Sequence, residues 1–468
     1  MHGWTRVPGA LALGLFIAGP ATPEEAPDVS AYREAAERVI AAARKDGRAW
    51  ERLAELTDTF GHRLSGSPQL EAALRWAEGG MKADGLENVR LEPVDVPHWV
   101  RGRESLDLVE PAGGDLVVLG LGGSVGTPED GLTAEVLPVA SFDDLEAKAA
   151  QAKGRIVLFN VPFTDYRQTV RYRGAGASRA AKLGAVAILL RSVGLPGLRT
   201  PHTGQMNYDE GVARIPAAAI PFEDAQRLQR IADRGQRVVV RLRMEARQLP
   251  DAPSANVVAE WKGREHPEEV VVVGGHIDSW DVGTGAMDDG GGSMVAWEAA
   301  RLLKSLGLRP RRTVRVVLFT NEENGLKGGT SYRDRHQQET HVAAIETDSG
   351  VFKPEGFGFT GTDRARALVK AIAGLLSPIG ATGVAADGGG ADIGPLVRAK
   401  GVPSLSLDVE GSRYFEFHHT PADTLERLDP AHVADCAASL AVMAYVLADL
   451  PERLPWAPPA TPAPLTGP

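Results

Sequence analysis

Cysteine is almost absent from this sequence of 468 residues. The single cysteine, Cys436, excludes an intrachain disulfide and a zinc site built from cysteines. Cys436 falls within the apolar helical pattern HVADCAASLAVMAYVLADL, so we expect its thiol to be buried and inert. Any chemistry of this chain must therefore come from other side chains.

Positive charge is also in short supply. The 51 Lys and Arg residues against 61 Asp and Glu residues leave a net charge of −10 at pH 7. This balance argues against nucleic acid or an anionic membrane as a partner. Nothing beyond the N-terminal segment resembles a transmembrane helix, so no membrane span is expected. The composition is otherwise that of a soluble globular protein.

The two ends of the chain differ from the rest. Arg6 is followed by the apolar run ALALGLFIAG, which is too short to span a bilayer, and then by small residues suited to cleavage after Ala21. Residues 1–21 therefore resemble a secretory signal peptide and predict a secreted or periplasmic protein. Residues 451–468 are rich in proline, which predicts a disordered tail.

The remaining length favours two domains. Residues 29–105 show helical patterns and a strand-like stretch, and residues 250–450 alternate apolar strands with helices. Uninterrupted apolar strands followed by helices predict an α/β/α sandwich, with a mostly parallel mixed sheet covered on both faces. Residues 106–245 carry many short β-type runs and few helices, which predicts an inserted β-rich domain. The α/β domain is thus expected to be discontinuous.

Polar side chains follow the apolar strands of the last segment, and others precede a helix that begins near Ser293. Because sites in open α/β sheets form at the carboxyl ends of strands, we expect these side chains to meet in one crevice. In chain order they are His276 and Asp278, Asp288 and Asp289, Glu322 and Glu323, Asp348, and then His418, His419 and Asp423.

Such a crevice predicts bound metal. Converging carboxylates repel one another unless cations compensate them. Imidazoles with carboxylates suit divalent ions, zinc first, and a pair of ions about 3.5–4 Å apart is a known hydrolytic arrangement. The count allows one histidine and one acid per ion, one shared acid and one acid free to act as a base. The glycines of GGHIDSWDVGTGAMDDGGG would let the backbone fold tightly round the ions.

Each feature also has a plainer explanation. A lone histidine at a strand end is usually structural, and Glu322-Glu323 alone would suit a solvated turn. Asp288-Asp289 could complement a helix dipole. It is the recurrence at successive strand ends that favours a metal site. The other histidines lack such a setting and are expected to be structural: His2, His62, His98, His202, His266, His336, His341 and His432.

A rival motif surrounds Ser124. The stretch GGSVG matches the G-x-S-x-G pattern of serine hydrolases. That nucleophile must sit on a turn running straight into a helix, but the next residues, TPEDGL, have no helical pattern. The sequence therefore disfavours a serine hydrolase.

Several stretches together resemble a known family: FGHRLSGSPQLEAALRW, GGHIDSWDVGTGAMDDGGG, LFTNEENGLKGG, ETDSG, GGGADIGPLVRAKGVP and YFEFHHTPADT. They are similar to the co-catalytic zinc exopeptidases, the family of secreted bacterial aminopeptidases and glutamate carboxypeptidases, and most of all to its carboxypeptidase Q branch. The resemblance covers most of residues 35–450. More loosely, KGRIVLFN and GASRAAKLGAVAILL make the insert resemble a protease-associated domain.

The resemblance implies two zinc ions per chain and a role for each site residue. His276 and Asp348 would bind one ion, Glu323 and His419 the other, and Asp288 would bridge them. The spacing in HHTPADT selects His419 over His418. Glu322 would be the general base, Asp278 would orient His276, and Asp423 is a candidate for the same role at His419. Where many relatives carry a serine-aspartate-histidine run, this chain has GADIGPL.

The expected function is therefore that of a secreted dizinc exopeptidase that hydrolyses dipeptides or peptide termini. Its partner would be a peptide or dipeptide substrate, and the resemblance suggests a homodimer. Three alternatives stay open. They are an aminopeptidase with the same dizinc site, a single-zinc transferase similar to glutaminyl cyclase, and a catalytically inactive binding module. The sequence does not distinguish recognition of a free amino terminus from that of a free carboxyl terminus.

Overall fold

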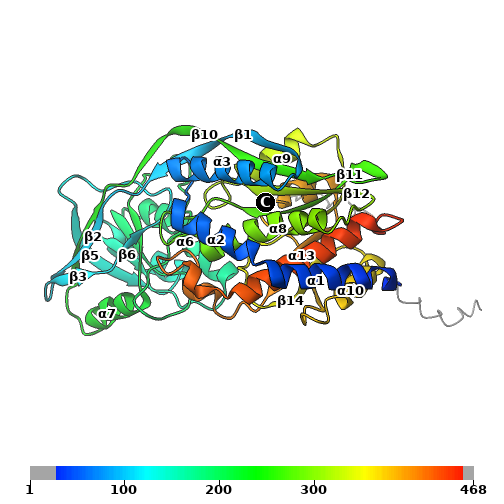
Figure 1. Ribbon diagram of the computed structural model, residues 1–468. Coiled ribbons are helices and arrows are strands. Elements are labelled where there is room, and N and C mark those ends of the chain that lie inside the picture. The colour runs from blue at the N-terminus through cyan, green and yellow to red at the C-terminus, as the bar shows by residue number, and fades with distance from the viewer. Residues whose placement is uncertain (1–27, 457–468) are drawn as a thin grey trace, which may run out of the picture.

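The computed structural model describes residues 28–456 and contains two eight-stranded sheets at opposite ends of the molecule (Figure 1). The predicted signal peptide, residues 1–21, and residues 457–468 of the predicted tail lie outside the described residues.

The first sheet combines a strand from the N-terminal part with strands from the C-terminal half. The strands β12, β11, β13 and β16 run parallel at its centre, and the strands that flank them, β10 and β14, pair with them in the antiparallel direction. This arrangement confirms the predicted mixed, largely parallel sheet. In spatial order the strands are β1 (Glu87–Val100), β10 (Arg247–Trp261), β12 (Arg312–Phe319), β11 (His266–His276), β13 (Thr340–Glu346), β16 (Ser404–Val409), β14 (Pro354–Thr360) and β15 (Gly383–Ala386).

Both faces of this sheet are covered. In β11, Val271 and Val273 belong to one core, whereas Val270 and Val272 belong to another on the opposite face. Because successive side chains of a strand point to opposite faces, this valine run is buried on both sides, and the predicted α/β/α sandwich is confirmed. One face carries α1 (Arg33–Asp46), α2 (Arg48–Phe60), α3 (Pro68–Ala83), α8 (Gly291–Ser305), α10 (Asp363–Gly374) and α13 (Pro430–Asp449); the other carries α9 (Lys327–Arg335) and α11 (Gly394–Lys400).

The helix α13 lies at the centre of the first core. Among the residues that the structure describes, it is the one helix long and apolar enough to cross a membrane, but 72% of that apolar window is buried inside the fold. It packs against α1 and α8. Cys436 is fully buried in it, as predicted, and burial raises the pKa of its thiol. The apolar character of α13 is thus that of a core helix.

The second sheet comprises strands from residues 104–244. Its strands, in spatial order, are β3 (Gly114–Leu116), β2 (Glu104–Glu110), β9 (Val239–Met244), β5 (Leu132–Val139), β6 (Ile156–Phe159), β7 (Ala187–Arg191), β8 (Ala217–Ile220) and β4 (Leu119–Gly120). Its helices are α4 (Phe142–Ala147), α5 (Ala149–Ala152), α6 (Tyr166–Lys182) and α7 (Phe222–Asp233).

The expectation of few helices in this segment is wrong. The helix α6 runs for 17 residues, and its buried face is made of Tyr172, Gly176, Ala177 and Ala180 among others. These positions recur at helical spacing, but three of the four are small and carry little hydrophobic signal. Their smallness lets α6 pack closely on the sheet, so the feature that hid the helix in the sequence is what fits it to the fold.

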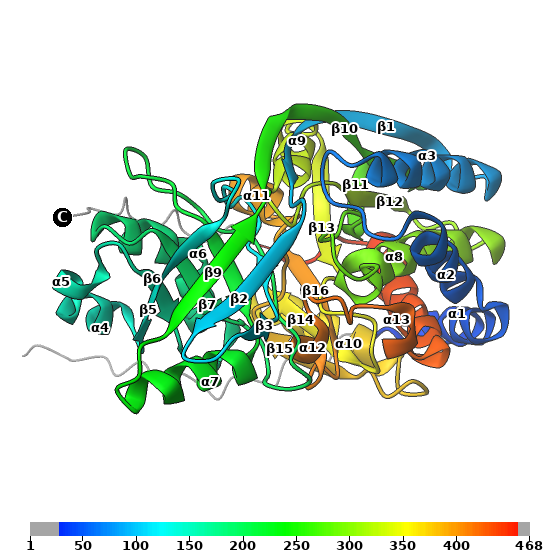
Figure 2. The same ribbon diagram turned by 90° about the vertical axis from the view of Figure 1, so that its left-hand side faces the viewer.

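Two neighbouring strands connect the sheets. The strand β1 pairs with β10 from Glu87 opposite Glu260 to Val100 opposite Arg247. Immediately beyond, β2 pairs with β9, with Glu104 opposite Met244. The chain therefore leaves the first sheet and returns to it along adjacent strands, visible in Figure 2.

Candidate metal centre

Three parallel strands of the first sheet bring their carboxyl ends to one edge. His276 is the last residue of β11 and pairs with Phe319, the last residue of β12, while Gly274 pairs with Glu346 at the end of β13. Glu322, Glu323 and Asp348 follow these strands within a few residues. Because the strands are in register, the polar side chains after them converge, as expected at such an edge.

Asp288 lies at the centre of the cluster. It is buried in the turn η2 (Ala286–Gly290), just before α8. Its Oδ1 lies 3.3 Å from His276 Nε2, and its Oδ2 lies 3.3 Å from His419 Nε2. On the first side His276 Nε2 is 3.5 Å from Asp348 Oδ1, and on the second His419 Nε2 is 3.1 Å from Glu323 Oε2. The structure thus brings the five predicted ligands together.

The donor set fits divalent metal. His276 Nε2 and Asp288 Oδ2 are buried and have no hydrogen-bond partner. Ligand atoms of His276, Asp288 and Glu323 all lie within 4.8 Å of one another, as do those of Asp288, His418 and His419. Buried polar atoms normally find partners, and a cation would satisfy these.

Charge at the cluster is unbalanced without a cation. Burial and the nearby Asp288 carboxylate raise the pKa of Glu323 to about 7. Burial likewise raises the pKa of Glu322 well above its usual range, with Asp348 and Glu323 adding to the effect. At His419 burial favours a lower pKa, but Glu323 and Asp288 outweigh it and raise the pKa to about 10. At the two glutamates burial and crowded carboxylates together favour protonation, at His419 the carboxylates alone do, and bound metal would offset these effects.

The cluster opens into a cavity of about 540 Å³. Asp288, Glu322, Glu323 and Asp348 line one part of its wall. The rest includes Tyr166, Arg173, Ser349, Asp408, Tyr414, Phe415, His418 and His419. The cavity can therefore admit a small molecule to the side chains that converge at the sheet edge.

Comparison with known proteins places this arrangement in a family. Residues 256–444 match the model of Peptidase family M28. Carboxypeptidase Q of Mus musculus is 48% identical over 433 residues, which are 92% of each chain. The chain belongs to peptidase family M28. This membership confirms the predicted class of enzyme, a zinc-dependent exopeptidase.

Solved structures of M28 and related enzymes agree with the fold. The crystal structure of a peptidase M28 precursor from Shewanella amazonensis SB2B is 37% identical, with a TM-score of 0.87 over 92% of this chain and 99% of that chain. The zinc aminopeptidase of Bacillus subtilis is 22% identical, with a TM-score of 0.64 over 85% of this chain and 94% of that chain, and shares the fold. The predicted fold class is thus confirmed on independent structures.

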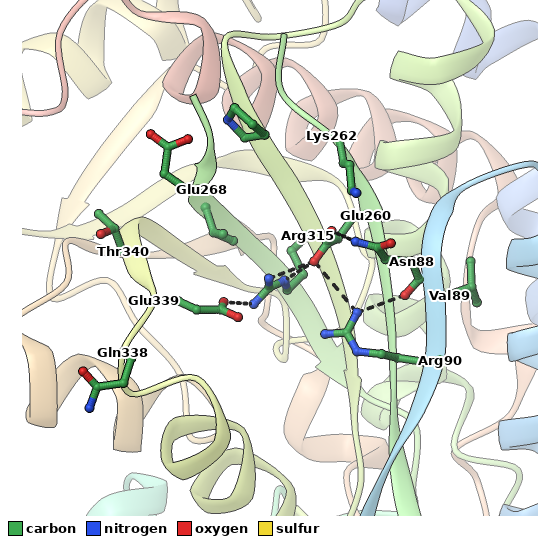
Figure 3. Close-up of a pocket in the computed structure, with 12 residues that line it drawn as sticks. Asn88, Val89, Arg90, Glu260, Lys262, Glu268, Arg315, Gln338, Glu339 and Thr340 are labelled. Carbon is green, nitrogen blue, oxygen red and sulfur yellow. Dashed lines mark hydrogen bonds and ion pairs between the residues drawn. The ribbon is translucent and has the colours of Figure 1, made fainter. Parts of the chain in front are cut away.

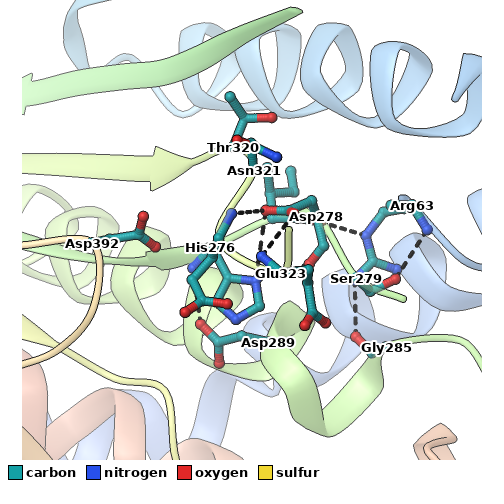
Figure 4. Close-up of polar contacts among 12 residues, drawn as sticks. Arg63, His276, Asp278, Ser279, Gly285, Asp289, Thr320, Asn321, Glu323 and Asp392 are labelled. Carbon is teal, nitrogen blue, oxygen red and sulfur yellow. Dashed lines mark hydrogen bonds and ion pairs between the residues drawn. The ribbon is translucent and has the colours of Figure 1, made fainter. Parts of the chain in front are cut away.

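Asp278 supports the candidate metal centre in two ways. Its carboxylate accepts hydrogen bonds from the main-chain N–H groups of Glu322 (3.1 Å) and Glu323 (3.4 Å). The Oδ1 of Asp278 lies 3.7 Å from His276 Nδ1. The main-chain oxygen of Asp278 is closer to that nitrogen, at 3.0 Å (Figure 4). An Nδ1–H donated to that oxygen leaves His276 Nε2 free to accept. Asp278 therefore fixes the turn that carries both glutamates as well as facing the histidine.

The role expected for Asp423 is wrong. Its carboxylate accepts from the main-chain N–H groups of Met287 (2.7 Å) and Asp288 (3.2 Å), so it anchors the central aspartate. His419 instead directs Nδ1 toward the main-chain oxygen of Thr203 at 3.3 Å. The loop after α12 (Tyr414–Phe417) brings Asp423 into contact with η2. This contact joins segments distant in sequence, so local sequence patterns do not predict it.

Two further residues of the converging set, His418 and Asp289, lie beside the predicted ligands. His418 Nε2 lies 3.5 Å from Asp288 Oδ2, and its ring stacks on that of His419, with centroids 3.5 Å apart. Both histidines therefore lie at the candidate metal centre. Asp289 is fully buried and accepts from the main-chain N–H groups of His276 and Gly292. A Cβ on Gly292 would lie 2.0 Å from Thr347 O, so the close packing round Asp289 requires glycine.

The segment of the second sheet contributes side chains that the sequence did not identify. Arg173 of α6 donates to the hydroxyl of Tyr166 and to the main-chain oxygen of Thr203, the atom that His419 faces. His202 is buried, as expected of a structural histidine, and its Nδ1 lies 2.8 Å from His418 O. Ser124, the rival nucleophile in this segment, is structural: its Oγ donates to Val125 O and accepts from Ala217 N.

A larger cavity, of about 910 Å³, lies at the opposite edge of the first sheet (Figure 3). Residues at the start of β11 and β13 line it, including Glu268 and Thr340. Its buried charges pair with one another: Arg315 binds Glu260 at 2.8 Å and also binds Glu339. None of the convergent strand-end residues reaches it, so the smaller cavity is the candidate site of this M28 peptidase.

Proposed function

We propose that this chain is a dizinc exopeptidase that hydrolyses dipeptides or the ends of short peptides. The observation that carries the proposal is the position of Asp288, which presents one oxygen to His276 and the other to His419, each at 3.3 Å. His276 and Asp348 would hold one zinc ion, Glu323 and His419 the other, and Asp288 both. When bound, the ions would lower the pKa of water and polarise the scissile carbonyl.

Glu322 would move the proton. It lines the cavity beside Asp348 and Glu323. Those two carboxylates contact His276 and His419, whereas the Glu322 carboxylate contacts neither histidine. The hydrogen bond from its main chain to Asp278 holds it in place. Its carboxylate would take a proton from the attacking water and give it to the leaving amine.

The size of the cavity supports a short substrate. Tyr166 stacks on Phe415, with ring centroids 5.1 Å apart, where the second-sheet segment meets the catalytic strands. This aromatic pair lines the cavity beside His418 and His419. A dipeptide or a peptide end would therefore fit better than a folded chain.

An aminopeptidase with the same site is the second candidate. Asp408 lines the cavity but is outside the proposed ligand set, and its Oδ1 accepts a hydrogen bond from Ser406. A carboxylate in that position suits the free amino group of a substrate. The single-zinc transferase and the inactive module have no such support.

The organisation of the chain follows from the same proposal. Residues 29–105 and 250–450 would form one discontinuous catalytic domain, and residues 106–245 an insertion similar to a protease-associated domain. The limits of the second sheet, Glu104 and Met244, support these boundaries. Residues 1–21 would direct export to the periplasm or the medium. We also propose a homodimer without a membrane span.

The test combines metal analysis with a substrate panel. Elemental analysis of the purified protein should give two zinc ions per chain, and free dipeptides should be hydrolysed in a reaction that a chelator stops and zinc restores. Loss of turnover on blocking only the amino end would identify an aminopeptidase; loss on blocking only the carboxyl end would identify a carboxypeptidase. One zinc ion with cyclisation of N-terminal glutamine would replace the proposal with the transferase.

A further inference from the structure

A buried arginine lies beside the metal centre. Arg63 belongs to the segment between α2 and α3, and 0% of its surface is exposed. Its guanidinium donates only to main-chain oxygens: Nε to Ile277 (2.7 Å), Nη1 to Gly61 and Thr284 (2.7 Å each), and Nη2 to Gly285 (2.9 Å). Figure 4 shows the Arg63 side chain beside Ser279 and Gly285. Burying a charged side chain costs free energy, so packing alone does not explain an arginine at this position.

Its partners define one loop. Residues 277–285 connect His276, at the end of β11, to the turn that carries Asp288. Arg63 binds the first residue of that loop, Ile277, and its last two residues. A guanidinium is a rigid planar fork, so it fixes the distance between the two ends it binds. The loop between two proposed ligands is thereby closed by one side chain.

The middle of the loop is held by the main chain of the same residue. The N–H of Arg63 donates to Ser279 Oγ at 2.9 Å, and its carbonyl accepts from Ser279 N at 3.2 Å. The next N–H, that of Trp280, donates to Glu323 Oε1 at 3.1 Å. The contacts of Arg63 therefore extend through the loop to a third proposed ligand.

Space and charge at this point suit an arginine. Gly285 has a φ of +56°, and a Cβ on it would lie 2.3 Å from Ser279 Cβ and 3.0 Å from Arg63 Nη2, so only glycine fits between Ser279 and the guanidinium. The nearest charges are carboxylates, of which Asp423, Asp278 and Asp289 are outside the proposed ligand set. The cation thus offsets acids that the metal ions would not bind directly.

We propose that Arg63 is a positioning residue of the metal centre: it holds residues 277–285 in the conformation that sets Asp288 and Glu323 toward their histidines before zinc binds. This inference rests on the proposed dinuclear site. It extends that site to a residue more than two hundred positions before the first ligand.

The test is the zinc affinity of Arg63→Lys, measured on the full chain by competition with a chromophoric chelator. Lysine keeps the charge but offers three donors from one atom, so it cannot reach the separate oxygens that Arg63 binds. We expect zinc affinity to fall by about 10- to 100-fold, the usual effect of losing a group that orients metal ligands. Activity should return in excess zinc.

Arg52→Lys is the matched control. Arg52 is also buried, lies on α2, binds Asp84 and Glu298, and covers the ring of Trp297. It makes no hydrogen bond to the loop. The variant should lower the melting temperature and leave zinc affinity unchanged, which separates a general loss of stability from a loss of positioning.

A milder variant covers the case in which Arg63→Lys does not fold. Ser279→Ala removes the side-chain acceptor of Arg63 N, together with the hydrogen bond that Ser279 Oγ donates to Trp280 O within the loop, and should weaken zinc binding several-fold. The inference is overturned if either folded variant binds both ions as tightly as the wild type, or if Arg52→Lys weakens binding equally. A wild-type chain that binds fewer than two ions contradicts the proposed function itself, which is a different outcome.

Discussion

At the scale of single residues, the proposed function gives the two adjacent glutamates different roles. Glu323 is held from two sides, by His419 Nε2 at 3.1 Å and by the N–H of Trp280 at 3.1 Å. Glu322 shares the same turn, the same Asp278 support and the same cavity wall, but its carboxylate makes neither of these two contacts. Neighbouring residues of one type therefore have different surroundings, and substitutions should separate them.

Glu322→Gln should retain both zinc ions and lose turnover. Glutamine has the size of glutamate but cannot accept the proton of the attacking water. General acid–base catalysis contributes about 10²–10⁴-fold, and because one group serves both proton transfers we expect the upper part of that range. Metal content and kcat measured on the same preparation test this. Near-normal kcat with both ions bound would transfer the role to His418 or Asp289.

Glu323→Gln should lose metal first and activity as a consequence. The amide removes a charged ligand from the His419 side while leaving Asp288, His276 and Asp348 intact. We expect one weakly bound and one tightly bound zinc ion, with activity partly recovered at high zinc concentration. Titration of the metal-stripped variant, compared with Glu322→Gln as its control, measures this. Two tightly bound ions would remove Glu323 from the ligand set.

At the scale of helices and strands, much of the candidate site could be predicted from the sequence. His276, Glu322 and Asp348 follow apolar strands within a few residues, and parallel strands in register bring such residues together. Arg63 and Asp423 act on main-chain groups of distant segments, and no local pattern marks such contacts. Their roles depend on where loops cross, which propensity and periodicity do not encode.

The strand β13 carries a histidine that should affect stability in acid. Burial, together with Arg315, lowers the pKa of His341 to about 3. The unfolded chain, with a pKa near 6.5, binds this proton first, so stability falls as the pH drops from about 6.5 toward 3. Each pH unit in that window costs up to about 1.4 kcal/mol.

His341→Gln should flatten this dependence. The variant loses the contact with the Tyr332 hydroxyl, at 3.0 Å, and is expected to be less stable at neutral pH. Its unfolding free energy should nevertheless fall less steeply between pH 6.5 and pH 4 than that of the wild type. Urea unfolding of metal-stripped protein over this range measures both slopes. Parallel curves would show that His341 does not titrate as described.

At the scale of the whole molecule, the segment that carries the second sheet also lines the cavity, through Tyr166 and Arg173 of α6. Arg173 and His419 are 246 positions apart, yet their nitrogens lie 3.4 Å from each other. Trp280, in the loop of residues 277–285, also approaches Gly122, where a Cβ would come within 1.9 Å of the indole. Contacts this distant in sequence could not be anticipated from either segment alone.

Tyr166→Ala should widen the range of substrates. The ring lines the cavity, stacks on Phe415 and holds Arg173 through its hydroxyl. Its removal opens the wall, so kcat/KM for tripeptides should rise several-fold relative to that for dipeptides. Tyr208→Phe, which alters the same segment away from the cavity, is the control. An unchanged ratio would show that Tyr166 does not limit substrate size.

The paired strands that join the two sheets have a consequence for how such a chain can evolve. Val100 lies opposite Arg247, so the segment between them begins and ends at neighbouring points of one ladder. A short reverse turn at that point would close the ladder without altering its register. The segment can therefore be lengthened or trimmed away from its contacts with His419, while the strand ends near His276, Glu323 and Asp348 keep their places. Selection can therefore change which peptides enter the enzyme without moving the strand ends that position the proposed metal ligands.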